Sequence, residues 1–200
     1  MRVLELASGL WRWTALHPDW TPEQGGPNGW GQEVGCVYYE APGAVVLVDP
    51  LVPPEDEERF WRALDRDLER AGKPVRILVT VHWHARSADA IAERYGAETG
   101  GPLPDGVEAY PAVAFDETIL WIPGHGALVF GDVVLGAEGG GVRLCPESWL
   151  EGGTLTVLKD ALRPLLDLPV ERLLVSHGEP VLEGGHAALA LVLAQSAARC

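Results

Sequence analysis

The chain has 200 residues, a net charge of −14 and 47% apolar residues, which is typical of one globular domain spanning 1–200. The negative charge and the lack of Lys and Arg clusters argue against a nucleic-acid partner, because phosphate backbones are held by such clusters. No apolar run approaches the roughly 20 residues needed to cross a bilayer. The N-terminus does not resemble a signal peptide, so we expect a cytoplasmic protein without a membrane partner.

Short strands alternating with helices are expected along the chain. Residues 1–50 carry β-like runs broken by a loop rich in Trp, Pro and Gly at His17–Gly31, whose Trp20 and Trp30 are candidates for lining a pocket. Pro and acidic residues at 53–57 then indicate a helix start. The remaining pattern predicts a strand at Ile77–Val81, a helix at Ser87–Arg94, strands at Val107–Tyr110, Val113–Phe115, Thr118–Ile122 and Ala127–Val134, a helix at Leu155–Leu166, a strand at Arg172–Val175 and a helix at Gly185–Ala198.

Two histidines separated by one residue end the apolar run in the segment VRILVTVHWHARS, which begins at Val75. Alternate residues of an extended segment point the same way, so His82 and His84 are expected to offer two imidazoles to one metal ion. Trp83 lies between them and is expected to point the opposite way, into the core.

Two later strands also end in polar residues. Ala127–Phe130 leads into Gly131-Asp132, and Arg172–Val175 leads into Ser176 and His177. Strand ends that each deliver one polar side chain are how metallohydrolases collect their ligands.

This order of motifs resembles the metallo-β-lactamase superfamily, whose signature is His-x-His-x-Asp-His, then Gly-Asp, then a late Gly-His-Gly. The resemblance begins with the run that ends at Asp49-Pro50 and covers most of the chain. It implies an α/β fold, a four-layer αββα sandwich. The chain is identified as a divergent member with an incomplete motif, because Arg86 and Ser87 stand where the family has its second-site Asp and His.

His125 is the one histidine between Ser87 and Asp132, and it competes for the role of the family's loop ligand. It lies in Pro123–Gly126, between two runs that read as the strands of a hairpin. We therefore interpret His125 as a turn residue.

The resemblance implies a metal site built from His82, His84 and Asp132, with His177 as a fourth ligand. One zinc ion at most is expected, since the Arg86 guanidinium replaces the second metal's positive charge. The alternative is a site without metal, in which Arg86 pairs with Asp132 and the histidines are hydrogen-bonded remnants.

A zinc site of this kind predicts hydrolysis of a small ester, thioester or lactone. Asp132 or His177 is expected to orient the attacking water, and Arg86 is expected to bind an anionic group of the substrate. The competing hypothesis is a degenerate domain that serves as a binding or oligomerisation scaffold, with a homo-oligomer left open. A third, a non-metal enzyme using Arg86 and Ser87, has no specific support, and Ser87 is equally suited to cap a helix. The three cysteines, Cys36, Cys145 and Cys200, do not suggest a disulfide framework.

Overall fold

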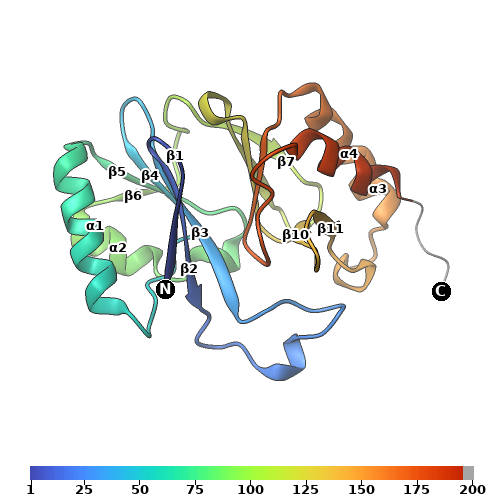
Figure 1. The fold of residues 1–200 in the computed structure, drawn as a ribbon, viewed down its shortest axis with the longest axis horizontal. Helices are drawn as coiled ribbons and strands as arrows, with labels where there is room; N and C mark the ends of the chain where they lie inside the picture. Colours follow the sequence, from blue (N-terminus) through green and yellow to red (C-terminus); the bar gives the residue numbers. More distant parts are fainter. Residues whose placement is uncertain (196–200) are drawn as a thin grey trace.

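Two β-sheets lie face to face, and each is covered on its outer side by helices (Figure 1). The computed structural model describes residues 1–195. Helices α1 (Glu57–Ala71) and α2 (Ala88–Tyr95) cover the N-terminal sheet, while α3 (Leu155–Leu162) and α4 (Gly185–Ala194) cover the C-terminal one. The predicted αββα sandwich is confirmed.

The N-terminal sheet has six strands in the order β1-β2-β3-β4-β5-β6. Strands β1 to β4 pair antiparallel, whereas β4, β5 and β6 pair parallel, so the ends of β4 and β5 point the same way. The strands are β1 (Arg2–Ala7), β2 (Leu10–Leu16), β3 (Glu33–Glu40), β4 (Val45–Val48), β5 (Val75–Leu78) and β6 (Glu98–Thr99).

The C-terminal sheet has four strands in the order β12-β9-β8-β7. Strands β9 and β12 pair parallel, so their carboxyl ends also meet at one edge. A separate hairpin of β10 and β11 follows β9. The strands are β7 (Glu108–Pro111), β8 (Thr118–Ile122), β9 (Ala127–Phe130), β10 (Val134–Gly136), β11 (Val142–Leu144) and β12 (Arg172–Val175).

The strand period of two residues divides the apolar side chains among three packed layers. On β8, Leu120 and Ile122 pack between the two sheets, whereas Ile119 and Trp121 pack toward α3 and α4. The third layer joins α1 and α2 to the N-terminal sheet and includes Phe60. The packing between the sheets fixes their edges relative to each other, and the polar strand ends meet at such an edge.

Four predicted elements differ from the structure, and one of them, the strand predicted at Ile77–Val81, ends at Leu78. The expected strand at Val113–Phe115 is wrong, because Val113 and Phe115 have left-handed backbone angles, with φ of 68° and 64°. The run Ala127–Val134 contains two strands separated by the Gly131-Asp132 loop. Helix α3 ends at Leu162 and continues as a 3₁₀ helix, since Pro164 cannot donate a backbone hydrogen bond.

The last predicted helix begins at Gly185 as expected and extends to Ala194. Residues 196–198 of that prediction, and Cys200, lie outside the described residues. Cys36 and Cys145 are free and buried in the cores, in agreement with the absence of a predicted disulfide framework for these two.

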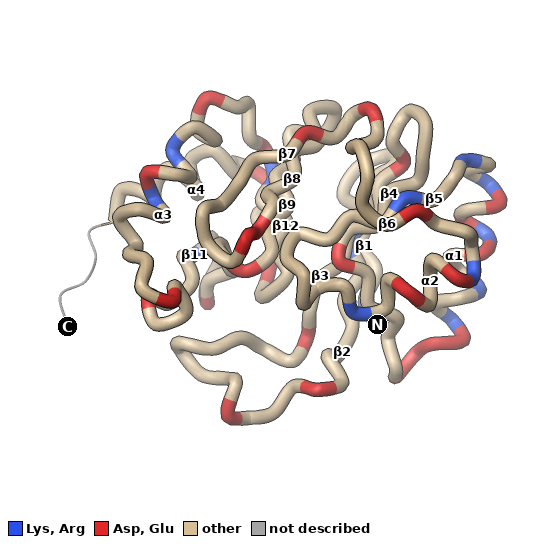
Figure 2. Tube along the Cα trace, turned by 180° about the vertical axis from the view of Figure 1, so that it is seen from behind, with Lys and Arg blue, Asp and Glu red and all other residues tan. Residues whose placement is uncertain are grey.

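Charged residues of both signs are interspersed along α1 (Figure 2). Arg59 pairs with Asp56, and Arg70 pairs with Glu40, so these guanidinium groups are neutralised locally. Among residues 1–195, no helix has both the length and the apolar character needed to span a bilayer.

Candidate metal centre

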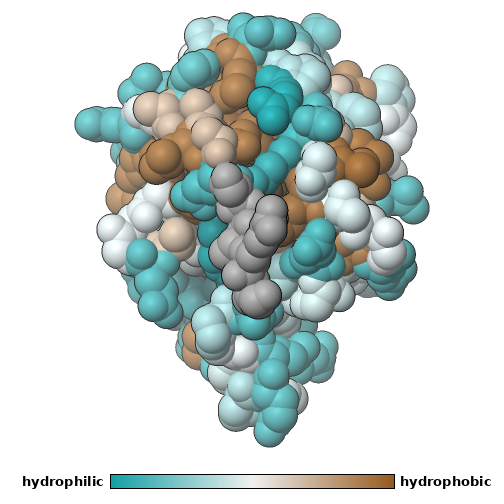
Figure 3. Space-filling model, turned by 90° about the vertical axis from the view of Figure 1, so that its right-hand side faces the viewer, coloured by the Kyte–Doolittle hydropathy of each residue, from teal (hydrophilic) through white to brown (hydrophobic). Residues whose placement is uncertain are grey.

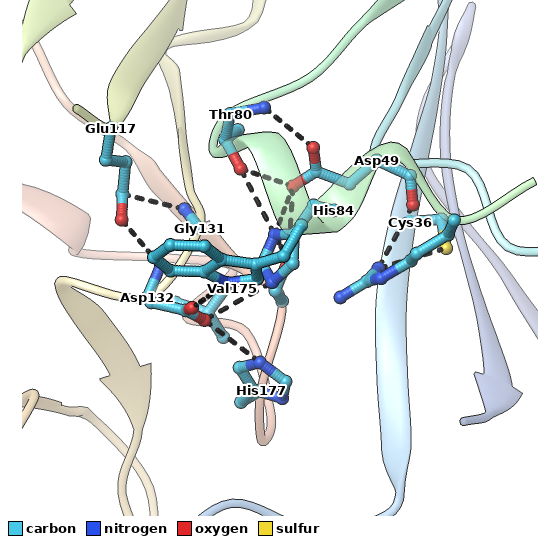
Figure 4. A network of polar contacts seen from close by, with 12 residues as sticks. Cys36, Asp49, Thr80, His84, Glu117, Gly131, Asp132, Val175 and His177 are labelled. Atoms are coloured by element: carbon cyan, nitrogen blue, oxygen red, sulfur yellow. Dashed lines mark hydrogen bonds and ion pairs between the residues drawn. The ribbon is translucent and has the colours of Figure 1, made fainter. Parts of the chain in front are cut away.

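Four strand ends deliver the polar side chains of one cluster (Figure 4). Asp49 directly follows β4, and His84 follows β5 in the N-terminal sheet. Asp132 follows β9, and His177 follows β12 in the C-terminal sheet. The backbone joins the two halves here, because the Gly35 amide donates to the Ser176 carbonyl at 2.7 Å.

The two histidines of the His-x-His motif diverge, so the expectation that both face one metal is wrong. Strand β5 ends at Leu78, and residues His82–Ala85 form a 3₁₀ helix. A 3₁₀ helix has about three residues per turn, so two residues along the chain the side chain is rotated by about 240° around the axis and no longer points the same way. His84 is buried, whereas His82 is exposed and packs its ring against Trp83.

Three of the four predicted ligands converge. The potential ligand atoms of His84, Asp132 and His177 all lie within 4.8 Å of one another, and all three residues are buried. Asp132 Oδ1 lies 3.0 Å from His177 Nε2 and 3.4 Å from His84 Nε2. His82 lies outside this group.

Asp132 Oδ1 has the environment of a metal ligand more than that of a hydrogen-bond acceptor. It is buried, and within residues 1–195 no donor is aligned to hydrogen-bond with it, although two imidazole nitrogens are near. Buried carboxylate oxygens without a partner are costly and call for an explanation. Two imidazoles and one carboxylate are a donor set that zinc accepts. The residues present therefore fit one zinc ion.

The electrostatics of the cluster suit a cation. Burial alone would raise the pKa of Asp132, but contacts with His177 and His84 outweigh it and hold that pKa well below its usual range. Burial lowers the pKa of His177 to about 4, so its imidazole is neutral at pH 7. A neutral imidazole and an ionised carboxylate, as in His177 and Asp132, are the protonation states that bind a metal. Burial would lower the pKa of His84, but the carboxylates of Asp49 and Asp132 outweigh it and raise that pKa, so a metal that binds His84 has to displace a proton.

Asp49 fixes the orientation of His84. Its Oδ2 lies 3.0 Å from His84 Nδ1. Thr80 holds the same carboxylate, donating from its amide at 2.8 Å and from its hydroxyl at 2.5 Å. A carboxylate on the far nitrogen of a histidine selects the tautomer that leaves Nε2 free for a metal.

His177 is held by backbone contacts on both sides of it. The buried Arg12 donates to the carbonyl oxygens of Val175 at 3.3 Å and Gly178 at 2.9 Å. The His177 carbonyl accepts a 2.8 Å hydrogen bond from the Gly136 amide. Gly136 also packs so closely against Gly178 and Glu179 that a Cβ atom there would lie 2.6 Å from the Glu179 backbone. Gly136 therefore helps to hold the backbone of His177 in place.

Glu117 supports Asp132 and was not predicted from the sequence. Its buried carboxylate accepts hydrogen bonds from the backbone amides of Gly131 at 2.9 Å, Asp132 at 2.7 Å and Val133 at 3.0 Å. Burial raises its pKa to about 7. A single acidic residue before an apolar strand carries no signal of this role.

Trp83 is not a core residue, as was expected, but a neighbour of the ligands. Its side chain is 45% exposed, and its Nε1 donates to Asp132 Oδ2 at 2.7 Å. This bond occupies one carboxylate oxygen and leaves Oδ1 for the cluster. The 3₁₀ helix that turns His82 outward also places the indole beside Asp132.

Trp83→Phe removes this hydrogen bond and keeps an aromatic ring. We expect zinc affinity to fall about 10- to 100-fold, which is the range for losing an outer partner of a metal ligand. Competition with a chromogenic chelator measures the change. Trp61→Phe is the matched control, because its Nε1 bonds to Glu57 on the distant α1. Equal zinc affinities for both variants would exclude a role for the Trp83 indole.

Arg86 does not pair with Asp132, which corrects the ion pair proposed for the metal-free alternative. In the described structure its Nη1 donates to the Asp49 carbonyl at 3.1 Å and lies 4.0 Å from Cys36 Sγ. Its backbone has a positive φ of 41°, a strained conformation for a residue with a side chain. Ser87 precedes α2, but its hydroxyl accepts from the Val52 amide and does not cap the helix.

The cluster opens into a cavity of about 500 Å³. Arg86 lines this cavity, and so does Trp30, whose ring lies 4.6 Å from that of His177. Trp20 lines a neighbouring hollow and supports Trp30 by donating to its carbonyl at 2.9 Å. The other lining residues are His17, Gln24, Trp83, His84, Phe115, Asp132, Ser148, Trp149, Glu151 and His177.

His125 lies in the turn between β8 and β9, as predicted, and its ring contacts Tyr39. The glycine-rich segment 136–141 connects β10 to β11. Neither is part of the cluster around Asp132.

Comparison with known proteins supports the fold over nearly the whole chain, although no family model and no curated protein sequence matches it. A metallo-β-lactamase from Hirschia baltica is 13% identical with a TM-score of 0.66, covering 96% of this chain and 97% of that one. One from Erythrobacter litoralis, with β-mercaptoethanol in its active site, is 16% identical with a TM-score of 0.64, covering 96% and 93%. FIM-1 from Pseudomonas aeruginosa, in its mono-zinc form, is 13% identical with a TM-score of 0.59, covering 96% and 94%. The chain therefore has the metallo-β-lactamase fold.

Proposed function

We propose that this protein is a metal-dependent hydrolase that acts on a small ester, thioester or lactone with one zinc ion. The ligands in this proposal are His84, Asp132 and His177. The observation that carries it is the buried Asp132 Oδ1, which faces two imidazole nitrogens without an aligned donor in the described chain. The mono-zinc form of FIM-1 supports it, because that structure pairs the same fold with a single ion.

A zinc ion held by these three residues would act as a Lewis acid toward the substrate carbonyl. The residues around the ligands orient them. Asp49 keeps His84 Nε2 free, and Trp83 leaves Asp132 with one oxygen directed at the cluster. Burial of the three ligands limits competing water and strengthens their electrostatic interactions.

Arg86 contributes a fixed positive charge to the cavity wall, and we propose that it binds a carboxylate or phosphate of the substrate. One of its Nη atoms is anchored on the Asp49 carbonyl, which holds the guanidinium in place. Arg86→Gln is then expected to raise KM for an anionic substrate about 10-fold or more, the cost of losing one charge-assisted hydrogen bond. Steady-state kinetics measure this change.

The matched control is Arg172→Gln, because Arg172 is also partly buried and donates to a backbone carbonyl, that of His125, outside the cavity. It should leave KM unchanged. If KM is unchanged in Arg86→Gln as well, Arg86 does not bind the substrate.

The proposed activity is tested by assaying zinc-loaded protein against a panel of esters, thioesters and lactones. We expect hydrolysis that chelation abolishes, that added zinc restores and that His177→Ala lacks. Zinc bound at one ion per chain without turnover of any member would contradict the hydrolase proposal.

A domain that binds a ligand without metal or catalysis is the competing proposal. It is favoured by the exposure of His82, which leaves three converging ligands in residues 1–195. Such a domain would be stabilised by its ligand but not by zinc. Thermal unfolding with and without zinc therefore separates the two proposals.

A further inference from the structure

A second hollow adjoins the cavity of the metal cluster. Its volume is about 340 Å³, and seven of its ten lining residues are apolar. We call it the annex and define it by its apolar lining residues Trp83, Val113, Ala114, Phe115, Leu150, Val157 and Leu158. It shares the lining residues Trp83, Phe115 and Glu151 with the cavity of the cluster, so the two hollows adjoin along these side chains.

The shared wall contains an aromatic pair beside Glu151. The rings of Trp83 and Phe115 meet edge to face, with their centroids 5.7 Å apart. The Trp83 indole is bound to Asp132, so one end of this wall is fixed to a predicted metal ligand. A molecule whose reacting group lies at the cluster would therefore meet the annex directly beyond this pair.

The segment that forms the annex rim is strained. Val113, Phe115 and Asp116 have φ values of 68°, 64° and 53°. A β-branched valine is a genuine outlier in this region. The segment is held at its ends by backbone bonds, from the Ala112 amide to the Glu117 carbonyl at 3.0 Å and from the Glu117 amide to the Ala114 carbonyl at 2.9 Å. Strain of this kind persists where the surroundings impose it, and it is concentrated at ligand sites.

Two apolar side chains of the annex are exposed to solvent. Val113 is 66% exposed and Val157, on α3, is 55% exposed, while Leu158 forms part of the floor and is buried. Apolar side chains are visible at the surface on the side of the molecule that carries α3 and α4 (Figure 3). An apolar hollow that opens into a polar cluster is the usual composition of a small-molecule site.

We infer that the annex binds an apolar arm of the substrate, so that the substrate is an ester, thioester or lactone bearing an alkyl or aryl group. The reacting carbonyl lies at the cluster, and the apolar arm passes the Trp83–Phe115 edge to contact Val113 and Val157. This inference rests on the proposed hydrolase function. The physical basis is the burial of methylene groups against four apolar side chains.

The test measures binding, not turnover. Isothermal titration calorimetry with butanoate, hexanoate and octanoate on zinc-loaded protein gives Kd as a function of chain length. We expect Kd to fall about tenfold or more from butanoate to octanoate, because each fully buried methylene contributes up to about fourfold and the annex is open on one side.

Val157→Asp is expected to remove this dependence on chain length while the zinc content stays unchanged. Leu191→Asp is the matched control, since Leu191 is a 65% exposed apolar residue on the neighbouring α4 and does not line the annex. It should retain the wild-type dependence. The chain-length series is measured on wild-type protein, so it tests the inference even if Val157→Asp fails to fold.

Equal Kd values for the three carboxylates on wild-type protein would overturn the inference. The same is true if Val157→Asp and Leu191→Asp behave alike in a folded state. The series repeated on zinc-free protein separates this inference from the proposed function. If zinc-free protein binds octanoate more tightly than butanoate, and Val157→Asp loses this difference, the annex is supported even if no metal binds. If the protein binds zinc but its Kd for the carboxylates does not depend on chain length, the annex is refuted and the proposed function is not.

Discussion

His84→Ala is expected to weaken zinc binding by more than about 100-fold, whereas His82→Ala binds zinc like the wild type. His84 Nε2 faces Asp132 Oδ1 at 3.4 Å, and its other nitrogen is held by Asp49. His82 is two residues away, exposed and outside the cluster. Losing an outer partner of a ligand already costs up to about 100-fold, so losing the ligand itself costs more.

The pair of variants is its own control, because both remove one imidazole from the same short 3₁₀ helix. Zinc content after dialysis against a buffered zinc solution, measured by plasma mass spectrometry, gives the result. Loss of zinc in His82→Ala at the level of His84→Ala would show that the motif ligates as a pair, as the sequence suggested and the structure does not.

Glu117→Ala is expected to lower the free energy of unfolding by about 3 to 6 kcal/mol. The substitution leaves the backbone amides of Gly131, Asp132 and Val133 buried without an acceptor, and each such loss costs about 1–3 kcal/mol, not fully additively. Urea unfolding measures the change. Glu108→Ala is the control: it removes an exposed glutamate from β7 and should change stability by less than about 0.5 kcal/mol.

Glu117→Gln separates the support of Asp132 from the packing of the side chain. Glutamine has nearly the same volume but one acceptor oxygen, and its NH₂ group would face amides that need an acceptor. We expect a smaller loss of stability than in the alanine variant, together with weaker zinc binding, because the Asp132 loop loses part of its support. Zinc affinity equal to the wild type in a destabilised Glu117→Gln would show that Glu117 serves stability alone.

The layered fold was predictable because its signals are local. The strand pattern at Thr118–Ile122 alternates between two cores, and polar residues follow the strands at Asp132 and His177. Parallel neighbours bring such ends to one edge of a sheet, so these positions could be expected to meet.

The His-x-His segment could not be read from its pattern, because the sheet ends before the apolar run does. Strand β5 pairs with β4 as far as Leu78, and its other neighbour, β6, has two residues. Within residues 1–195, no strand pairs with the chain beyond Leu78. The chain therefore turns into a 3₁₀ helix, and the side-chain period changes from two to about three. This change exposes His82 and places Trp83 beside Asp132.

Glu117, Arg86 and the annex depend on long-range contacts that carry no local signal. Glu117 is 15 residues from Asp132 in the chain, and Arg86 contacts the Asp49 carbonyl from 37 residues away. The strained backbone at Val113 is imposed by its surroundings and contradicts the β preference of valine.

The central claim is one metal ion held by His84, Asp132 and His177. The most direct test is the zinc content of wild-type protein purified without a metal-affinity tag, stripped with chelator and equilibrated with buffered zinc, beside Asp132→Asn. We expect one zinc ion per wild-type chain and a large loss of zinc in the variant. No zinc in the wild type, or equal zinc in both proteins, would contradict it.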